Sequence, residues 1–172
     1  MGTEGAKKIV AKARCLVVDD DEDLRWVVMR SLMRADFHCE AARDGDHALQ
    51  LMSQSDFQIV VTDLRMPKKH GFSLATEIMK VSQAKPAIIV YTGIEEPKLI
   101  AQLLSMGVDD VLIKPMNPDI LAAKVTAVYG RWVDRQPKDD AKADSEARSA
   151  KSEDRARKSA KNDRKVVKLV SS

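Results

Sequence analysis

Short runs of apolar residues alternate along this chain with segments in which apolar residues recur at helical spacing. The first run is CLVV, directly after Arg14. In the segment behind it, the apolar residues three or four positions apart are Leu24, Val27, Val28 and Leu32. A run of this length predicts a strand, and the spacing behind it predicts a helix with one apolar face. The same pair of signals recurs through the runs FHCEA, FQIVVTD, AIIVYT and DVLIK, up to a last helical segment from Ile120 to Tyr129.

Five predicted strands therefore alternate with five predicted helices, and this alternation favours a parallel sheet. Runs such as IVV and AIIV are apolar at consecutive positions, so both faces of these strands are expected to be buried. Helical segments are also the usual connections between parallel strands. The pattern predicts an α/β fold, an open, doubly wound sheet of five parallel strands with helices on both faces.

Polar residues stand at the ends of four of the five predicted strands. In a doubly wound sheet the functional crevice lies at the carboxyl ends of the strands, so these positions carry most information about function. They are Asp19-Asp20-Asp21, Thr62-Asp63, Thr92-Gly93 and Lys114-Pro115. Asp21 stands directly before a helical segment that opens with Glu22 and Asp23, and it is expected to cap that helix.

The remaining strand-end residues supply the groups that phosphoryl transfer requires. Asp19, Asp20 and Asp63 would repel one another at one edge of the sheet unless a cation lay among them, which suggests a hard divalent metal. Mg²⁺ is favoured over Ca²⁺ because few protein oxygens are available, and Mg²⁺ commonly completes its coordination with water and phosphate oxygens. Lys114 and Thr92 would contribute a positive charge and a hydroxyl donor to that phosphate. Asp63 is the predicted nucleophile, since a carboxylate can attack phosphorus to form an acyl phosphate.

Composition narrows the class of protein without changing this interpretation. Hydrophobic residues make up 44% of the 172 residues, charged residues 32% and aromatic residues 4%. These values are typical of a globular domain and leave little for a surface that stacks on nucleic-acid bases. No apolar run reaches the length of a membrane span, and the N-terminus lacks the apolar core of a signal peptide, so a cytoplasmic protein is expected. Cys15 and Cys39 lie in apolar segments without metal-ligand spacing and are expected to act as small buried hydrophobic residues.

Charge divides the chain into two parts. Residues 1–130 contain 16 Lys and Arg against 18 Asp and Glu, whereas residues 131–172 contain 13 against 8. The second part consists mainly of Ala, Ser and mixed charges, and it cannot bury enough apolar surface to offset the entropy of ordering. We therefore expect an N-terminal extension (1–11), one folded domain (12–133) and a charged tail (134–172) that is disordered or marginally helical.

Four motifs together resemble the receiver domain of bacterial two-component response regulators, over about residues 12 to 130. In chain order, they are LVVDDDEDLR, IVVTDLRMPKKHGFSL, VYTG and VLIKP. The resemblance implies a flavodoxin-like sheet with the strand order 2-1-3-4-5. It also implies that Asp63 accepts a phosphoryl group from the phosphohistidine of a sensor histidine kinase or a phosphotransfer protein.

The resemblance further implies a role for each strand-end residue. The implied ligands of Mg²⁺ are Asp20 directly, Asp19 mainly through water, the Asp63 carboxylate and the Arg65 backbone carbonyl. Thr92 would donate a hydrogen bond to the phosphoryl group, and Lys114 would pair with it. The peptide bond before Pro115 is often cis in this family, which would help to direct the lysine.

Two positions depart from the pattern of that family. An aromatic residue often stands three positions before the lysine and swings inward on activation, but here that position is Val111. The loop after the Met-Pro pair carries Lys68, Lys69 and His70, which adds positive charge beside the phosphorylation site. The change on activation is therefore expected to centre on Thr92 and the helix that follows it.

These features favour a stand-alone receiver, similar to the chemotaxis regulators, that binds a downstream protein when it is phosphorylated. The 42 residues after Gly130 show no helix-turn-helix pattern and are fewer than the DNA-binding domain of many response regulators requires. Two alternatives are a nucleic-acid-binding regulator that acts through the basic tail and a Mg²⁺-dependent phosphatase with an aspartate nucleophile. The phosphatase is disfavoured because Arg65 stands where haloacid-dehalogenase-like phosphatases place an acid-base aspartate.

Overall fold

A computed structural model of the chain describes residues 13–66, 71–81 and 85–136. The chain divides after residue 134, and the fold given below is that of the part before this division. Three predictions fall outside the described residues: the N-terminal extension at 1–11, the basic charges of the loop before Gly71, and the charged tail beyond residue 136.

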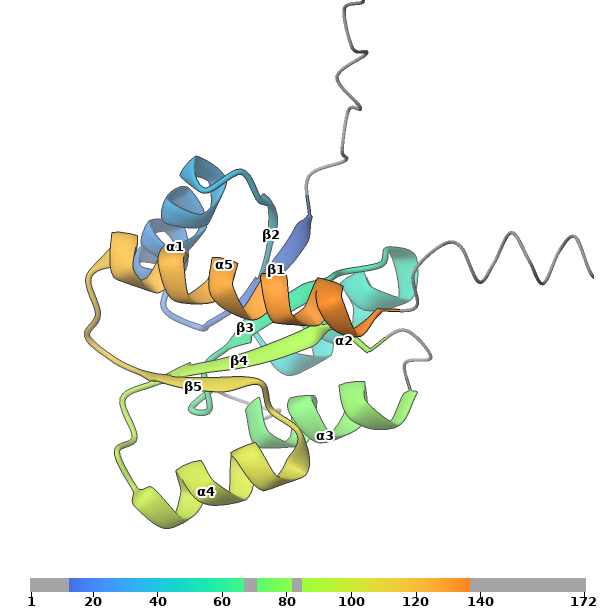
Figure 1. The fold of residues 1–172 in the computed structure, drawn as a ribbon, viewed down its shortest axis with the longest axis vertical. Helices are drawn as coiled ribbons and strands as arrows, with labels where there is room; N and C mark the ends of the chain where they lie inside the picture. The colour runs from blue at the N-terminus through green and yellow to red at the C-terminus, as the bar shows by residue number, and fades with distance from the viewer. Residues whose placement is uncertain (1–12, 67–70, 82–84, 137–172) are drawn as a thin grey trace, which may run out of the picture. The chain divides into compact units, whose positions relative to one another are not determined.

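Strands and helices alternate in the order that the sequence pattern predicts (Figure 1). The strands are β1 (Arg14–Val18), β2 (His38–Ala42), β3 (Ile59–Thr62), β4 (Ala87–Thr92) and β5 (Asp110–Ile113). The helices are α1 (Glu22–Arg34), α2 (Gly45–Gln54), α3 (Gly71–Val81), α4 (Pro97–Met106) and α5 (Pro118–Arg135). The sheet order is β2-β1-β3-β4-β5, and every neighbouring pair is parallel. The predicted doubly wound α/β fold and the strand order implied by the resemblance are both confirmed.

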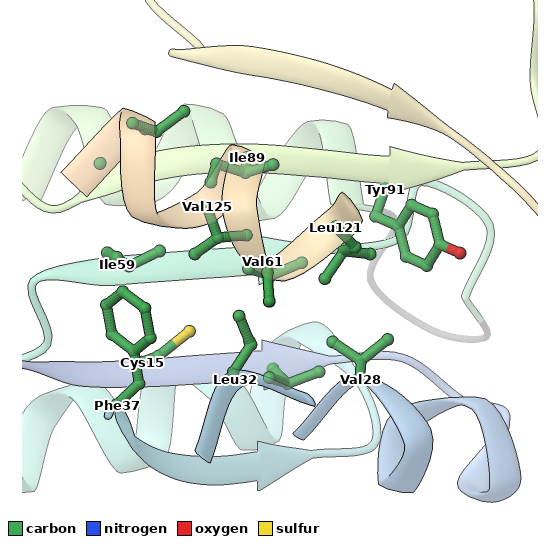
Figure 2. Packing of buried hydrophobic residues seen from close by; sticks show 14 of the residues in the cluster. Cys15, Val28, Leu32, Phe37, Ile59, Val61, Ile89, Tyr91, Leu121 and Val125 are labelled. Carbon is green, nitrogen blue, oxygen red and sulfur yellow. The ribbon is translucent and has the colours of Figure 1, made fainter. Parts of the chain in front are cut away.

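Helices cover both faces of the sheet. α1 and α5 lie on one face, and α2, α3 and α4 pack against the other (Figure 1). All residues of β3 and β4 are buried, because successive side chains of a strand point to opposite faces and each face has a helical layer above it. Figure 2 shows the first layer, where Leu32 of α1 and Val125 of α5 pack over Val61 and Ile89. Burial of each such side chain contributes about 1.5–3 kcal/mol to folding.

Aspartate side chains cap the first two helices at their N-termini. A carboxylate oxygen of Asp21 accepts a hydrogen bond from the Leu24 N–H at 3.0 Å, and Asp44 accepts one from the His47 N–H at 2.8 Å. Each bond satisfies an N–H that has no partner within the helix. The capping role predicted for Asp21 is confirmed.

The last helix is longer than the apolar pattern predicts, because it continues to Arg135 instead of ending at Tyr129. The Trp132 ring stacks on Tyr129 with 6.0 Å between centroids, and its Nε1–H donates a hydrogen bond to the Lys85 carbonyl oxygen at 2.7 Å. Lys85 lies far away in the sequence, so a local apolar pattern does not contain this contact. Neither α5 nor any other helix in the described segments has the length and apolar character needed to cross a membrane.

Cys15 and Cys39 are paired positions on β1 and β2, and both are free thiols. Cys15 is fully buried, whereas Cys39 is partly exposed. Hydrogen bonding to Cys39, together with burial, raises the pKa of the Cys15 thiol well above its ordinary value. Hydrogen bonding to Cys15 lowers the pKa of Cys39 against an opposing effect of burial. Cys15 thus behaves as the small buried hydrophobic residue that the sequence predicts, and Cys39 does so only in part.

Candidate functional site

Parallel register brings the aspartates that follow β1 and β3 side by side. Val18 and Thr62 are paired positions at the ends of these strands, and the Asp63 N–H donates a hydrogen bond to the Val18 carbonyl oxygen at 2.9 Å. Carboxylate oxygens of Asp19, Asp20 and Asp63 all lie within 4.8 Å of one another. The structure therefore brings together the three carboxylates that the sequence suggested for a metal site.

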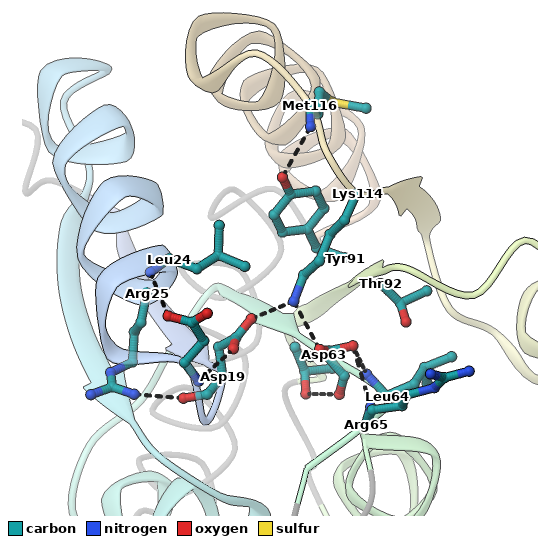
Figure 3. Close-up of polar contacts among 12 residues, drawn as sticks. Asp19, Leu24, Arg25, Asp63, Leu64, Arg65, Tyr91, Thr92, Lys114 and Met116 are labelled. Carbon is teal, nitrogen blue, oxygen red and sulfur yellow. Dashed lines mark hydrogen bonds and ion pairs between the residues drawn. The ribbon is translucent and has the colours of Figure 1, made fainter.

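Lys114 reaches this cluster from the end of β5. In the sheet, β4 lies between β5 and β3, and both β3 and β4 lie between β5 and β1. Its Nζ donates hydrogen bonds to Oδ2 of Asp19 at 2.7 Å and to Oδ2 of Asp63 at 2.8 Å (Figure 3). Burial acts to lower the pKa of Lys114, but the hydrogen bonds to Asp19 and Asp63 and their negative charges outweigh it and raise the pKa. The side chain is therefore a charged ammonium group that bridges the two carboxylates.

The Asp63 carboxylate is held by hydrogen bonds at both oxygens. Oδ2 accepts from Lys114, and Oδ1 accepts from the backbone N–H groups of Leu64 at 2.5 Å and Arg65 at 3.3 Å. Asp63 is only 8% exposed, whereas the Arg65 side chain points to solvent. The loop after β3 thus orients the predicted nucleophile through its backbone.

Asp19 is buried and fixed in the same manner at the end of β1. Its Oδ1 accepts a hydrogen bond from the Asp21 N–H at 2.9 Å, and its carbonyl oxygen accepts one from Nη1 of Arg25 at 2.6 Å (Figure 3). Asp20, the next residue, is exposed. Asp19 is therefore buried and held by hydrogen bonds, whereas Asp20 is exposed to solvent.

The charges of the cluster do not balance. Within the described residues, Asp19, Asp20 and Asp63 contribute three negative charges, and their ion-pair partner Lys114 contributes one positive charge. Carboxylates this close are unfavourable unless more positive charge lies among them. Their oxygens are hard ligands, which suit Mg²⁺, Ca²⁺ or Mn²⁺ better than metals that prefer nitrogen or sulfur. The cluster therefore fits a hard divalent cation.

Thr92 and Pro115 occupy the ends of β4 and β5. Thr92 is completely buried, and its hydroxyl oxygen accepts a hydrogen bond from the Ile94 N–H at 3.4 Å. Figure 3 shows its side chain apart from the bridge that joins Lys114 to Asp63. The peptide bond between Lys114 and Pro115 is cis, as the resemblance implies. Thr92 thus lies at the same edge of the sheet, with its hydroxyl proton not used in the contact with Ile94.

Gly71, the first residue of α3, packs against the backbone of the predicted nucleophile. Its N–H donates a hydrogen bond to the Leu64 carbonyl oxygen at 3.2 Å. A Cβ atom at this position would lie 1.8 Å from the carbonyl oxygen of Asp63. Only glycine permits so close an approach. Hydrophobic spacing indicates no role for Gly71, although a glycine at the start of a helical segment is a visible signal.

Tyr91 is a second residue whose role the sequence pattern does not indicate. Its ring centroid lies 5.3 Å from Nζ of Lys114, and its hydroxyl oxygen accepts a hydrogen bond from the Met116 N–H at 3.2 Å (Figure 3). Tyr91 is only 4% exposed. A tyrosine in a strand that is buried on both faces needs a partner for its hydroxyl group, and this requirement was the available signal.

Family models and related sequences point to the same protein family. Residues 15–126 match the family described as the response regulator receiver domain. Protein PetR of Rhodobacter capsulatus is 36% identical over 116 residues, which cover 67% of this chain and 48% of PetR. The probable transcriptional regulator ycf27 of Guillardia theta is 32% identical over 120 residues, which cover 70% of this chain and 46% of that protein. The chain therefore spans about half the length of these relatives.

Solved structures show the same similarity at the level of the fold. The chemotaxis response regulator CheY4 of Vibrio cholerae is 30% identical, with a TM-score of 0.64, and the match covers 68% of this chain and 98% of CheY4. The receiver domain of the Francisella response regulator 1452 is 27% identical, with a TM-score of 0.65, and the match covers 70% of this chain and 98% of that one. Both matches cover nearly all of the known domain.

Proposed function

Since this chain belongs to the response regulator receiver domain family, we propose that Asp63 accepts a phosphoryl group from a histidine kinase or a phosphotransfer protein. Phosphorylation-dependent signalling is the role expected of that family. The proposal assigns the chemistry to one carboxylate, at the end of β3. Its support is the geometry around that carboxylate.

The single observation that carries the proposal is the bridge from Lys114 to Asp19 and Asp63. Nζ of Lys114 lies 2.8 Å from Oδ2 of Asp63, so an incoming phosphoryl oxygen would meet a positive charge beside the attacking atom. Attack by Asp63 forms an O–P bond and breaks the P–N bond of the phosphohistidine, whose imidazole leaves with the electron pair. Lys114 would then move a hydrogen bond from the carboxylate to the phosphoryl group, where negative charge develops.

The carboxylates of Asp19, Asp20 and Asp63 and the carbonyl of Arg65 would hold Mg²⁺. The support for this assignment is the excess of two negative charges in the cluster and its all-oxygen donor set. When bound, Mg²⁺ offsets the charge of the carboxylates and of the phosphoryl oxygens. Among the described residues, Lys114 forms the ion pairs with Asp19 and Asp63 and offsets one of the three negative charges, so binding of the phosphoryl group would depend on the additional charge of Mg²⁺.

The output of the domain follows from Thr92 and the segment behind it. The Thr92 hydroxyl accepts a hydrogen bond from Ile94 but is free to donate its proton to a phosphoryl group at Asp63. Such a bond would draw in the segment that leads to α4 and shift an existing equilibrium toward a surface that a downstream protein binds. The chain would act as a signalling protein that takes part in its own phosphorylation and dephosphorylation. Nucleic-acid binding through the basic tail concerns residues almost wholly outside the described part of the chain and is not proposed.

Labelling with a small phosphodonor tests the proposal without a kinase. Incubation with Mg²⁺ and phosphoramidate should add one phosphoryl group to the wild-type chain and none to the Asp63→Asn variant. Intact-mass spectrometry measures the number of groups added. Hydroxylamine should remove the group, because it cleaves acyl phosphates.

Asp56→Asn provides the matched control. Asp56 is an exposed aspartate in the segment before β3, so the variant makes the same change of charge outside the cluster. It should be labelled as fast as the wild type. If Asp63→Asn gains the label as readily as Asp56→Asn does, Asp63 is not the acceptor.

A further inference from the structure

We propose that Tyr91 is a positioning residue for Lys114, and that it acts through the lysine on the phosphoryl transfer proposed above. The inference rests on the proposed function for its effect on rate, but the contacts themselves belong to the fold. Tyr91 contacts neither Asp63 nor the carboxylate cluster in the hydrogen bonds of the described residues. Any influence on the chemistry therefore passes through the lysine.

Strand register places the two side chains on one face of the sheet. Tyr91 of β4 and Leu112 of β5 are paired positions, and both belong to the cluster beneath α1 and α5. Lys114 stands two residues after Leu112, so its side chain leaves the backbone on the same face. From there it must pass over the end of β4 to reach the carboxylates, and Tyr91 is the large side chain at that point (Figure 3).

Tyr91 constrains the lysine at two places. Nζ lies over the ring, 5.3 Å from its centroid, within the range at which an ammonium group is attracted to an aromatic ring. The hydroxyl oxygen accepts the hydrogen bond of the Met116 N–H at 3.2 Å, and Met116 is two residues beyond the lysine. The ring therefore restricts the direction of the side chain, and the hydroxyl holds the backbone from which it starts.

A lysine needs such constraints more than most side chains. Its charge stands on a flexible four-carbon chain, yet Nζ must lie between two carboxylates that follow different strands. Side-chain atoms of Lys114 remain 17% exposed, so packing alone does not enclose it. The contacts with Tyr91 provide part of the order that the bridge requires.

Packing in the core is the competing explanation, and a double-mutant cycle separates the two. Tyr91→Leu and Tyr91→Phe are each combined with Lys114→Met, and the rate of labelling by phosphoramidate is measured at saturating Mg²⁺. With Lys114 present, Tyr91→Leu should lower the rate about tenfold and Tyr91→Phe about threefold, since the first removes both contacts and the second only the hydroxyl. With Met at position 114, both substitutions should change the rate by less than about twofold. Equal losses in the two backgrounds would overturn the inference.

Ile89→Ala is the control for loss of core packing. Ile89 is fully buried, two residues before Tyr91 on the same strand and in the same cluster. The Ile89→Ala substitution should lower the melting temperature at least as much as Tyr91→Leu but leave the labelling rate of the folded protein unchanged. A rate loss in Ile89→Ala as large as that in Tyr91→Leu would show that packing, not positioning, sets the rate. Tyr91→Phe keeps the ring, so the cycle still decides if Tyr91→Leu does not fold.

A second measurement does not depend on phosphorylation. The side-chain ammonium of Lys114 in the ¹⁵N-labelled protein should give a protected, slowly exchanging NMR signal, which Lys114→Met identifies. The signal should weaken in Tyr91→Phe and disappear in Tyr91→Leu, but persist in Ile89→Ala. Persistence in Tyr91→Leu would refute the positioning role even if the wild-type protein is labelled normally. Absence of any labelling in the wild type would instead reject the proposed function. The NMR signal would then still decide whether Tyr91 positions Lys114.

Discussion

Ile59 is the first residue of β3, and Asp63 is the residue directly after the end of this strand, yet the two residues are held in different ways. Ile59 is fully buried among apolar side chains, in the cluster beneath α1 and α5. Asp63 lies at the carboxyl edge of the sheet, where its oxygens accept hydrogen bonds from Leu64, Arg65 and Lys114. The interior gains free energy from burial that depends little on direction. The edge depends on a few directed hydrogen bonds, from two backbone N–H groups and one lysine, to a charged carboxylate.

This difference indicates how each region contributes to the free energy of folding. Burial in the interior stabilises the fold, whatever happens at the edge. The edge crowds three carboxylates around one lysine, and this arrangement costs stability that a cation would offset. Substitutions of interior residues that do not contact Lys114 should therefore change stability and leave the chemistry of folded molecules intact, whereas charge substitutions at the edge should change the chemistry.

Gly71→Ala should have the largest effect on stability, although Gly71 lies at the edge, because the backbone of Asp63 is packed directly against it. The added Cβ would lie 1.8 Å from the Asp63 carbonyl oxygen, so the backbone must shift. We expect the free energy of unfolding to fall by more than about 4 kcal/mol, measured by urea denaturation. Gly130→Ala is the control, since nothing lies within 4 Å of a Cβ at that helical position. It should stabilise the protein by up to about 1 kcal/mol, and equal effects of the two substitutions would contradict the packing argument.

Ile59→Ala should show the behaviour expected of the interior. Removing this fully buried side chain leaves a cavity and should lower the free energy of unfolding by about 3 kcal/mol, with Ile59→Val costing about 1 kcal/mol. Urea denaturation gives both values. Under conditions where the protein is folded, labelling by phosphoramidate should proceed at the wild-type rate. A slower rate that scales with the lost stability would mean that interior and edge are not separable.

Lys114→Met should affect both stability and chemistry at the edge. It leaves Asp19 and Asp63 without the donor that they share, so we expect a loss of about 2 kcal/mol in EDTA. Added Mg²⁺ should narrow this difference, because it supplies the missing positive charge. Labelling should fall at least about tenfold, by loss of a charge aimed at the phosphoryl group. Lys124→Met, at an exposed position of α5, should match the wild type in both measurements.

Asp20→Asn should have the smallest effect on stability, and one of opposite sign. It removes one of three crowded carboxylates, so the melting temperature in EDTA should rise by about 2 °C. The stabilisation that Mg²⁺ gives the wild type should be mostly lost, because the exposed carboxylate at this position is an assigned ligand. Asp56→Asn should keep the wild-type response to Mg²⁺. An Asp20→Asn protein that responds in the same way would remove Asp20 from the metal site.

The sequence by itself determined the elements, the type of fold and the chemistry collected at one edge. Signals of this kind are local. An apolar run is a strand, an apolar repeat is a helix face, and an aspartate before that repeat is a cap, as Asp21 shows. The parallel topology then follows from the alternation of strands and helices. It places every strand-end residue at one edge, so the grouping of Asp19, Asp20 and Asp63 could be foreseen without coordinates.

Only the tertiary structure decided how those residues are joined. Lys114 is 95 residues from Asp19 and 51 from Asp63, so no local pattern indicates that its ammonium group bridges the two. The strand order itself came from a resemblance and not from periodicity. Strand register places Tyr91 beside Lys114 and Met116. The last part of α5 contains Trp132, which donates a hydrogen bond to the carbonyl oxygen of the distant Lys85. Hydrophobic spacing depends on residues a few positions apart, whereas each of these contacts depends on which strands become neighbours and how the side chains between them pack.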